Sequence, residues 1–252
     1  MSKIPALIAA RNAPRVGETV SALADTAWPI VIPNGCTDDT AEIAERAGAT
    51  IVDCDVEGKT PALQAGIQFL GEAALHEPFM MVDADTVPVF RSRFVDAMGA
   101  ARSRLDPDKP ALLVGPLRYI RGASFTSDLA RTVILARRQF RSQFDPNAGR
   151  FGGNSMLLDI NGNEALLDAI LGLGNLWPCE DEAIKDAVVS HGGNTLKVMD
   201  VRALATTDCR SAVGFFERLK IGAAAASAAW ERSYADDAPE GSVPYVLRRG
   251  LA

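Results

Sequence analysis

A buried strand that leads directly into two carboxylates is the feature that most constrains how this 252-residue chain folds. Residues Phe79 to Val82 are apolar, and Asp83 and Asp85 follow them with one alanine between. In an extended backbone, side chains two residues apart point the same way, about 6.5 Å apart at a rise of about 3.3 Å per residue, so both carboxylates can face one ligand. Pro88 cannot donate to a strand ladder, and we expect no further pairing there. The segment predicts a buried strand that ends at a site.

Two neighbouring carboxylates repel each other, and a positive group between them relieves that repulsion. A hard divalent cation such as Mg2+ or Mn2+, shared with substrate phosphates, is the usual such group, which makes Asp83 and Asp85 candidate ligands. The alternative is an acidic turn that caps the strand. The D-x-D pattern alone leaves both interpretations open.

Composition and length exclude several other classes of protein. A chain of 252 residues that is 48% hydrophobic can bury the core of one large α/β domain. It has no run of about 18 apolar residues and no signal-peptide pattern at its start, so we expect a cytoplasmic protein. The net charge of −6 argues against a general nucleic-acid binder. Four scattered cysteines and two histidines predict reduced thiols and no metal site built on cysteine or histidine.

Strands and helices alternate along much of the sequence. We expect strands at Ile4 to Ala10, Trp28 to Pro33, Thr50 to Cys54, Phe79 to Val82, Ala111 to Leu117 and Leu196 to Val201. We expect helices at Val16 to Ala24, Ala41 to Ala47, Pro61 to Phe69, Phe90 to Arg104, Phe125 to Phe144 and from Glu180 to His191. This alternation predicts a mostly parallel sheet with helices on both faces, and ligands of such sheets bind beyond the carboxyl ends of the strands.

Polar residues gather at those expected ends and in later turns. Arg11, Asn34 and Asp83 each follow a strand, and Thr37 or Asp38 is placed as the N-cap of the second helix. Three acids begin the helix at Glu180, which the helix dipole alone would explain. Ala205 to Arg210 is expected to be a polar loop.

Taken in order from Ile4 to Arg210, these segments resemble the family 2 glycosyltransferases. Those enzymes have the GT-A fold and transfer a sugar from a nucleotide diphosphate sugar with inversion. The resemblance rests on six motifs in the family's order: Ala9 to Asn12 for the opening P-A-R-N-E turn, Val31 to Thr40 for V-D-D-G-S-T-D-G-T, Gly58 to Gly66 for G-K-x-x-A-L-N-x-G, Asp83 to Asp85 for the metal-binding D-x-D, Glu180 and Asp181 for the catalytic E-D, and Thr207 to Arg210 for T-S-x-R. It implies one GT-A domain over residues 1–214, with a Rossmann-like nucleotide-sugar half at about 1–110 and an acceptor half at about 111–214, then a helical tail over 215–252.

The resemblance also implies roles for individual residues. Asp85, with Asp83, would hold Mn2+ or Mg2+ against the diphosphate, whose growing charge must be neutralised as it leaves. Asp181 would be the base that takes the proton of the acceptor hydroxyl, and Glu180 would bind the acceptor or orient that base. The implied nucleotide-binding residues are Arg11, Asn12, Asn34, Lys59, Asp83 and Arg210, and the implied acceptor-binding residues are Gly153 and Trp177. Lys59 and Arg210 as surface cations, and Trp177 as a core residue, are the alternatives.

The sequence departs from the family pattern in three places. Pro33 and Asn34 replace the paired acids of the nucleobase segment, so the base of the donor stays open, and Ala13 replaces a glutamate. The Q-x-x-R-W motif of processive synthases is absent, because Phe215 to Leu219 has a different sequence. Transfer of a single sugar to a saccharide or lipid-linked saccharide is therefore favoured over polymer synthesis.

Three rival functions remain. A haloacid dehalogenase-like phosphohydrolase would use Asp83 and Asp85, although its D-x-D belongs on the first strand. A GT-A nucleotidyltransferase would need a glycine-rich opening that Leu7 to Val16 lacks. A sugar-nucleotide-binding protein without activity is the third. The tail, with Phe215 to Trp230 and a basic apolar end, could cover the core, pair two subunits or lie on the inner face of a membrane.

Overall fold

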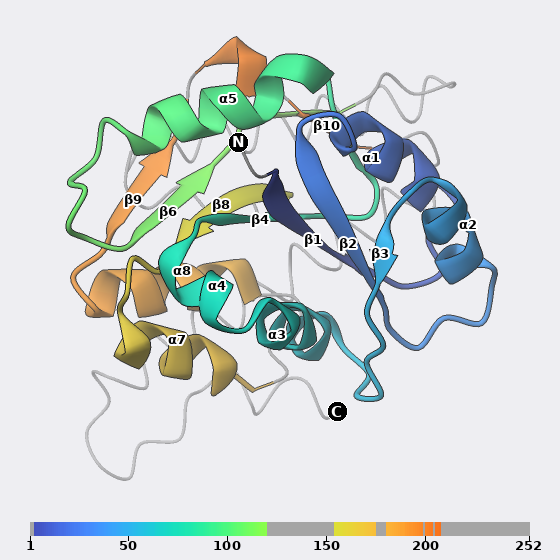
Figure 1. The fold of residues 1–252 in the computed structure, drawn as a ribbon, viewed down its shortest axis with the longest axis horizontal. Helices are drawn as coiled ribbons and strands as arrows, with labels where there is room; N and C mark the ends of the chain where they lie inside the picture. The colour runs from blue at the N-terminus through green and yellow to red at the C-terminus, as the bar shows by residue number, and fades with distance from the viewer. Residues whose placement is uncertain (1–2, 120–153, 175–179, 199, 204, 208–252) are drawn as a thin grey trace, which may run out of the picture.

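A seven-stranded sheet forms the centre of the molecule, and helices cover both of its faces (Figure 1). The computed structural model describes residues 3–119, 154–174, 180–198, 200–203 and 205–207. In spatial order the strands are β3 (Thr50–Ile51), β2 (Ala27–Pro33), β1 (Ile4–Ala10), β4 (Phe79–Val82), β8 (Ser155–Asp159), β6 (Ala111–Val114) and β9 (Asn194–Lys197). Strand β8 is antiparallel to both of its neighbours, and the other pairs are parallel. The expected mostly parallel α/β sheet is confirmed.

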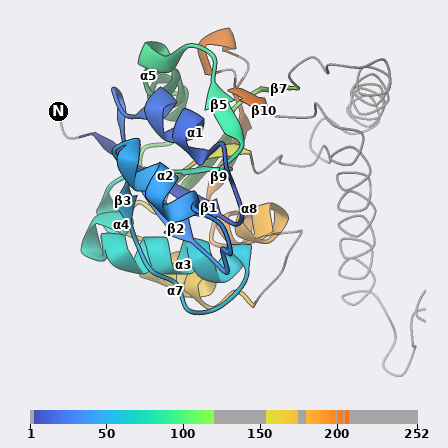
Figure 2. The ribbon, with the colours of Figure 1, turned by 90° about the vertical axis from the view of Figure 1, so that its right-hand side faces the viewer.

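The helices divide into two groups, one on each face of this sheet. Helices α1 (Val16–Leu23), α2 (Thr40–Arg46) and α5 (Arg91–Arg102) pack on one face, and α3 (Lys59–Leu70), α4 (Glu72–His76), α7 (Glu164–Leu171) and α8 (Glu180–Ser190) pack on the other. Figures 1 and 2 both show α1 and α5 on one side and α3 and α7 on the opposite side. Successive residues of β1 alternate between the two cores, because side chains of a strand point to opposite faces: Ala6 and Ile8 join the first, and Leu7 joins the second.

A second sheet of three short strands lies beyond the D-x-D segment. Its order is β5 (Thr86–Pro88), β10 (Ala205–Thr207) and β7 (Leu117–Tyr119). The expectation that pairing stops before Pro88 was wrong, because Pro88 pairs with Ala205 across antiparallel strands. Strand β5 lies at the edge of its sheet, where a missing N–H donor is tolerated. The expected loop at Ala205 to Arg210 was also wrong over its first three residues.

Several boundaries differ from those expected. Strand β3 has two residues instead of five, and the strand expected at Ala111 to Leu117 divides into β6 and β7 at Gly115 and Pro116. A Cβ atom at Gly115 would lie 2.9 Å from the carbonyl oxygen of Ala203, so the chain passes there only without a side chain. Helix α2 has Asp39 at its N-cap position, without a capping side-chain bond, and Asp38 instead accepts from the backbone N–H of Thr40 at 3.1 Å.

Other expectations concern parts of the chain that the structure does not describe. The helix expected at Phe125 to Phe144 and the tail from 215 onward lie outside the described residues. Within the described residues, no helix is long and apolar enough to span a membrane. Of the four cysteines, Cys36 and Cys54 are described, and neither forms a disulfide within the described residues.

Candidate active site

Lys59 joins two acidic segments that lie far apart in the sequence. Its Nζ atom is 2.6 Å from Oδ1 of Asp83 and 2.6 Å from Oε1 of Glu180. Asp83 follows β4, Glu180 is the first residue of α8, and Lys59 is the first residue of α3. The G-K, D-x-D and E-D segments, which the sequence analysis singled out separately, therefore meet at the carboxyl end of β4.

Asn154 completes the surroundings of Asp83. Its Nδ2 atom donates to Oδ2 of Asp83 at 2.8 Å, and its carbonyl oxygen accepts from the backbone N–H of Asp83 at 3.0 Å. Both carboxylate oxygens of Asp83 are thus hydrogen-bonded, one to Lys59 and one to Asn154. Sequence reasoning missed Asn154, although its position directly after Gly152 and Gly153 and before a strand was a usable signal.

Two glycines of the G-K segment place Lys59 at this position. Gly58 has a φ of 134°, in the region that favours glycine, and precedes the helix. A Cβ atom at Gly66 would lie only 3.0–3.2 Å from the side chains of Leu7 and Ile32. Helix α3 can therefore lie close against β1 and β2, and its first residue reaches the carboxyl ends of the strands.

Asn34 fixes the loop that leads into α3. It is 3% exposed, its Nδ2 donates to the carbonyl of Val56 at 2.5 Å and to Sγ of Cys54 at 3.3 Å, and its Oδ1 accepts from the backbone N–H of Gly58. The amide holds residues 54–58 against the end of β2. The structure thus gives Asn34 a supporting role that the sequence analysis did not foresee.

The central lysine is held in its charged form. Burial alone would lower the pKa of Lys59, but the negative charges of Asp83 and Glu180 and their hydrogen bonds raise the pKa well above its usual value. Glu180 is 5% exposed, and its second oxygen, Oε2, has no hydrogen-bond partner among the described residues. A buried carboxylate oxygen without a partner is costly, and a ligand hydroxyl at this position would satisfy it.

Asp181 has the properties of a proton acceptor. Burial raises its pKa to about 6, the neighbouring charge of Glu180 adds to that effect, and Lys59 opposes it. At neutral pH the carboxyl group is mostly ionised, yet it is a stronger base than an ordinary aspartate. A base whose pKa lies near the working pH is suited to general base catalysis.

Asp83 and Asp85 are the candidate ligands of a divalent cation at the end of β4. No group of three or more histidine, cysteine, aspartate or glutamate side chains gathers anywhere in the described ranges. Asp83 follows β4 and accepts hydrogen bonds from Lys59 and Asn154, and Asp85 lies half-buried between β4 and β5. Mg2+ and Mn2+ are commonly held by one or two carboxylates together with substrate phosphates, so this arrangement fits such an ion.

The remaining predicted residues lie at the ends of β1 or outside the described chain. Arg11 forms an exposed ion pair with Glu57, and Asn12, at a φ of 44°, accepts from the backbone N–H of Thr37 at 2.8 Å through Oδ1. Both follow the carboxyl end of β1, as expected. Gly153, Trp177 and Arg210 lie outside the described residues.

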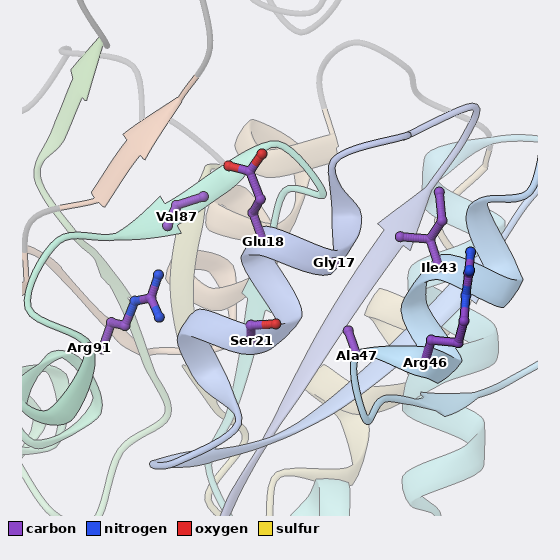
Figure 3. A pocket seen from close by; sticks show the side chains of 8 residues that line it. All are labelled: Gly17, Glu18, Ser21, Ile43, Arg46, Ala47, Val87 and Arg91. Carbon is purple, nitrogen blue, oxygen red and sulfur yellow. The ribbon is translucent and has the colours of Figure 1, made fainter.

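A separate surface hollow of about 560 Å³ lies on the other face of the sheet, between α1, α2 and the start of α5. Figure 3 shows Glu18 and Ser21 of α1 between Arg91 on one side and Arg46 of α2 on the other. None of the predicted site residues lines this hollow. It belongs to the outer surface of the helices and adds nothing to the site at the strand ends.

Comparison with solved structures identifies the fold. No protein-family model matches the sequence, and no curated protein matches it. Glucosyl-3-phosphoglycerate synthase from Mycobacterium tuberculosis in complex with Mn2+ and UDP-glucose superposes with a TM-score of 0.51 at 15% identity, over 78% of this chain and 69% of that chain. The complex of the same enzyme with Mg2+ and UDP gives a TM-score of 0.54 at 16% identity, over 78% and 69%. A structure described as a mycobacterial protein gives 0.52 at 18% identity, over 85% and 70%.

At these identities the likeness shows the fold alone. The order of strands and helices in the described residues matches that of GT-A glycosyltransferase structures. The expected GT-A fold is therefore confirmed.

Proposed function

We propose that this chain is a glycosyltransferase that moves one sugar from a nucleotide diphosphate sugar to a hydroxyl acceptor, with inversion at the anomeric carbon. The observation that carries the proposal is the contact of Lys59 with both Asp83 and Glu180, directly beside Asp181 with its pKa of about 6. A cation for the leaving group and a base for the nucleophile are the two things that this reaction needs. A neighbour in fold binds UDP-glucose with Mn2+, which supports a nucleotide diphosphate sugar as the donor without fixing its base.

On the donor side, the diphosphate leaves with the electrons of the bond between its oxygen and the anomeric carbon. Lys59 is held in the charged form by Asp83 and Glu180, which take two of its three N–H donors, and its third N–H would donate a charge-assisted hydrogen bond to the departing phosphate. A divalent cation held by Asp85 would supply further neutralisation of that charge. Asn154 and Asp83 keep the lysine in place, so this charge is present before the bond breaks.

On the acceptor side, Asp181 takes the proton of the hydroxyl as its oxygen forms the new bond to the anomeric carbon. Attack opposite the departing diphosphate inverts the configuration. The second oxygen of Glu180 is available to a substrate hydroxyl. Saccharides and lipid-linked saccharides are the proposed acceptors, and phosphoglyceric acid, which is bound by a neighbour in fold, adds a small phosphorylated hydroxy acid to the set to be tested.

The phosphohydrolase alternative agrees less well with the site. A nucleophilic aspartate needs an oxygen that can reach phosphorus, whereas both oxygens of Asp83 accept hydrogen bonds from Lys59 and Asn154. Its strand is also the fourth in the chain. The second alternative, a sugar-nucleotide-binding protein without activity, is distinguished from a transferase by the turnover assay described next.

The experiment is a thermal-shift and turnover assay with UDP-, GDP- and dTDP-sugars, with and without Mn2+ or Mg2+. The native chain should show a metal-dependent rise in the unfolding midpoint with one donor, by mass action. Asp85→Ala should lose that rise, whereas Asp181→Asn should keep it and lose about 10²–10⁴-fold in turnover. Asp108→Asn, an exposed acid in a distant loop, is the matched control.

Each other outcome of this assay indicates a different class of protein. Metal-dependent release of nucleotide with no transfer to any acceptor would identify a hydrolase. Tight binding without either reaction would identify a binding protein. If none of the nucleotides binds in the presence of metal, the transferase proposal is wrong.

A further inference from the structure

The carboxyl ends of β4, β1, β2 and β3 form the edge of the sheet where a nucleotide would bind. The position of the diphosphate on this edge indicates where the base of the donor lies. This inference rests on the proposed function. Lys59, Asp83 and Asp85 mark where the diphosphate lies, at the end of β4. The carboxyl ends of the parallel strands share one edge of the sheet, and β1, β2 and β3 follow β4 along it. The nucleobase of a donor bound along this edge therefore lies over the residues that follow those three strands.

Asn34, which follows β2, cannot recognise a base in this structure. It is 3% exposed, and both its carbonyl oxygen and its amide nitrogen are hydrogen-bonded to residues 54–58. Reading a base with this side chain would require breaking the bonds that position Gly58 and hence Lys59. The base must be recognised by other groups at this end of the edge.

Arg11 and Glu57 bring a positive and a negative side chain together at that end. Arg11 follows β1 and Glu57 precedes Gly58 in the loop that Asn34 holds. They form an ion pair, and each side chain is 61% exposed. The Glu57 side chain lies over Gly35, since a Cβ atom at Gly35 would be 3.4 Å from its Cγ and 3.9 Å from its Oε1. An ion pair this exposed contributes little stability, and both side chains are open to a ligand that approaches this edge.

We propose that Glu57 and Arg11 read the base and that the base is guanine. On its Watson–Crick edge guanine presents two adjacent donors, N1–H and the N2 amino group, which match the two oxygens of one carboxylate. Guanine O6 and N7 are acceptors that an arginine fork pairs with. Uracil and thymine present one N–H between two carbonyls, so the second carboxylate oxygen would face a carbonyl oxygen. Adenine and cytosine each place an acceptor nitrogen beside their single amino group. A guanosine diphosphate sugar is therefore the donor class.

The test measures equilibrium binding of GDP, UDP, ADP and CDP, each with Mg2+, to the full chain and two variants. We expect GDP to bind the native chain at least tenfold more tightly than UDP. Glu57→Gln should weaken GDP binding by tenfold or more and leave UDP binding within about twofold, because one amide N–H₂ then opposes a guanine donor. Glu45→Gln, an exposed glutamate on α2, should leave both affinities unchanged.

The failures of this inference and of the proposed function are separable. UDP binding as tightly as GDP, or equal loss of both nucleotides in Glu57→Gln, would overturn the guanine assignment and leave a nucleotide-dependent transferase standing. No binding of any nucleotide would overturn both. Arg11→Gln is a second variant for the same binding assay. It removes the partner of guanine O6 and N7, so it should lower GDP affinity more than UDP affinity.

Discussion

Lys59 is the residue on which the charge balance of the site depends. It sits between two carboxylates, with 24% of its own side chain exposed, against 23% for Asp83 and 7% for Glu180. Charges this poorly solvated are tolerable only while they are paired. The sequence analysis left open a phosphate contact or a surface cation, and the structure shows a mostly buried lysine that is already paired with two acids of its own chain.

Replacing Lys59 with methionine should destabilise the fold. Removing one partner of a fully buried pair costs about 3–5 kcal/mol, and partial exposure here lowers our expectation to about 1–3 kcal/mol. Urea denaturation at pH 7.5 measures it. Lys109→Met, which removes a 54% exposed ammonium 3.6 Å from Asp106, is the control and should change stability by less than about 0.5 kcal/mol.

A double variant separates the charge effect from lost packing. Lys59→Met with Glu180→Gln leaves one fewer unpaired charge, so it should be more stable than Lys59→Met alone. A Lys59→Met variant no less stable than Lys109→Met would show that the paired carboxylates do not depend on this lysine.

Asp181 should make the folded state less stable as the pH rises. Its pKa is raised from 3.8 to about 6, so the folded chain binds this proton more tightly than the unfolded chain does. The contribution of Asp181 to stability is then largest below about pH 4 and falls as the pH rises from about 4 to 6, because the unfolded state releases the proton first.

Asp181→Asn should therefore raise stability at pH 7.5 by about 1–3 kcal/mol, a figure discounted for the partial exposure of the carboxyl group. The gain should shrink to nothing near pH 4. Urea titrations between pH 4 and 8 measure it, with Asp186→Asn, an exposed acid on the same helix, as the control. A difference between native chain and Asp181→Asn that did not change with pH would contradict the raised pKa.

Helix α3 carries the site lysine because it lies unusually close to the sheet. Gly66 occupies the contact with Leu7 and Ile32, and the added methyl group of Gly66→Ala would meet their side chains at 3.0–3.2 Å. We expect a loss of about 1–3 kcal/mol from overpacking. Gly99→Ala on α5 has nothing within 4 Å of the new atom, and should instead gain about 0.4–1 kcal/mol by restricting the unfolded chain.

Urea denaturation of both glycine variants gives the comparison directly. Opposite signs for Gly66→Ala and Gly99→Ala are the expected result. Equal gains would mean that α3 has room to move away from β1 and β2, and the close-packing explanation of the G-K segment would fail.

The elements themselves were largely predictable, because hydrophobic alternation and helix boundaries are local. The strand at Ile4–Ala10 and the helix at Arg91–Arg102 follow from their own residues. What could not be predicted depends on distant partners. Pro88 pairs with Ala205 because an edge is free there, and Asn154 reaches Asp83 because β8 enters the sheet antiparallel to β4. Likewise, the sequence around Asn34 does not show that both the oxygen and the nitrogen of its side-chain amide will be hydrogen-bonded to residues 54–58.

At the scale of the molecule, the strands before and after residue 110 share one sheet. Strand β4 pairs with β1 on one side and with β8 on the other, with Met80 opposite Leu157 and Met81 opposite Met156. Phe79 and Met81, both almost completely buried, belong to the same core as residues of β8, α7 and α8. Residues on both sides of position 110 therefore belong to one core.

It follows that residues 1–110 should not fold stably by themselves. The fragment would keep strands β1 to β4 but would expose the edge of β4 and the apolar side chains that α7 and α8 cover, and such an edge favours aggregation. We expect size-exclusion chromatography to show aggregates and near-ultraviolet circular dichroism to show no fixed tertiary packing. Co-expression with residues 111–252 should restore a soluble complex, because the missing strand β8 then returns to its place between β4 and β6. A monomeric 1–110 fragment with a cooperative urea transition as stable as that of the full chain would show instead that the two halves are independent domains joined only by strand pairing.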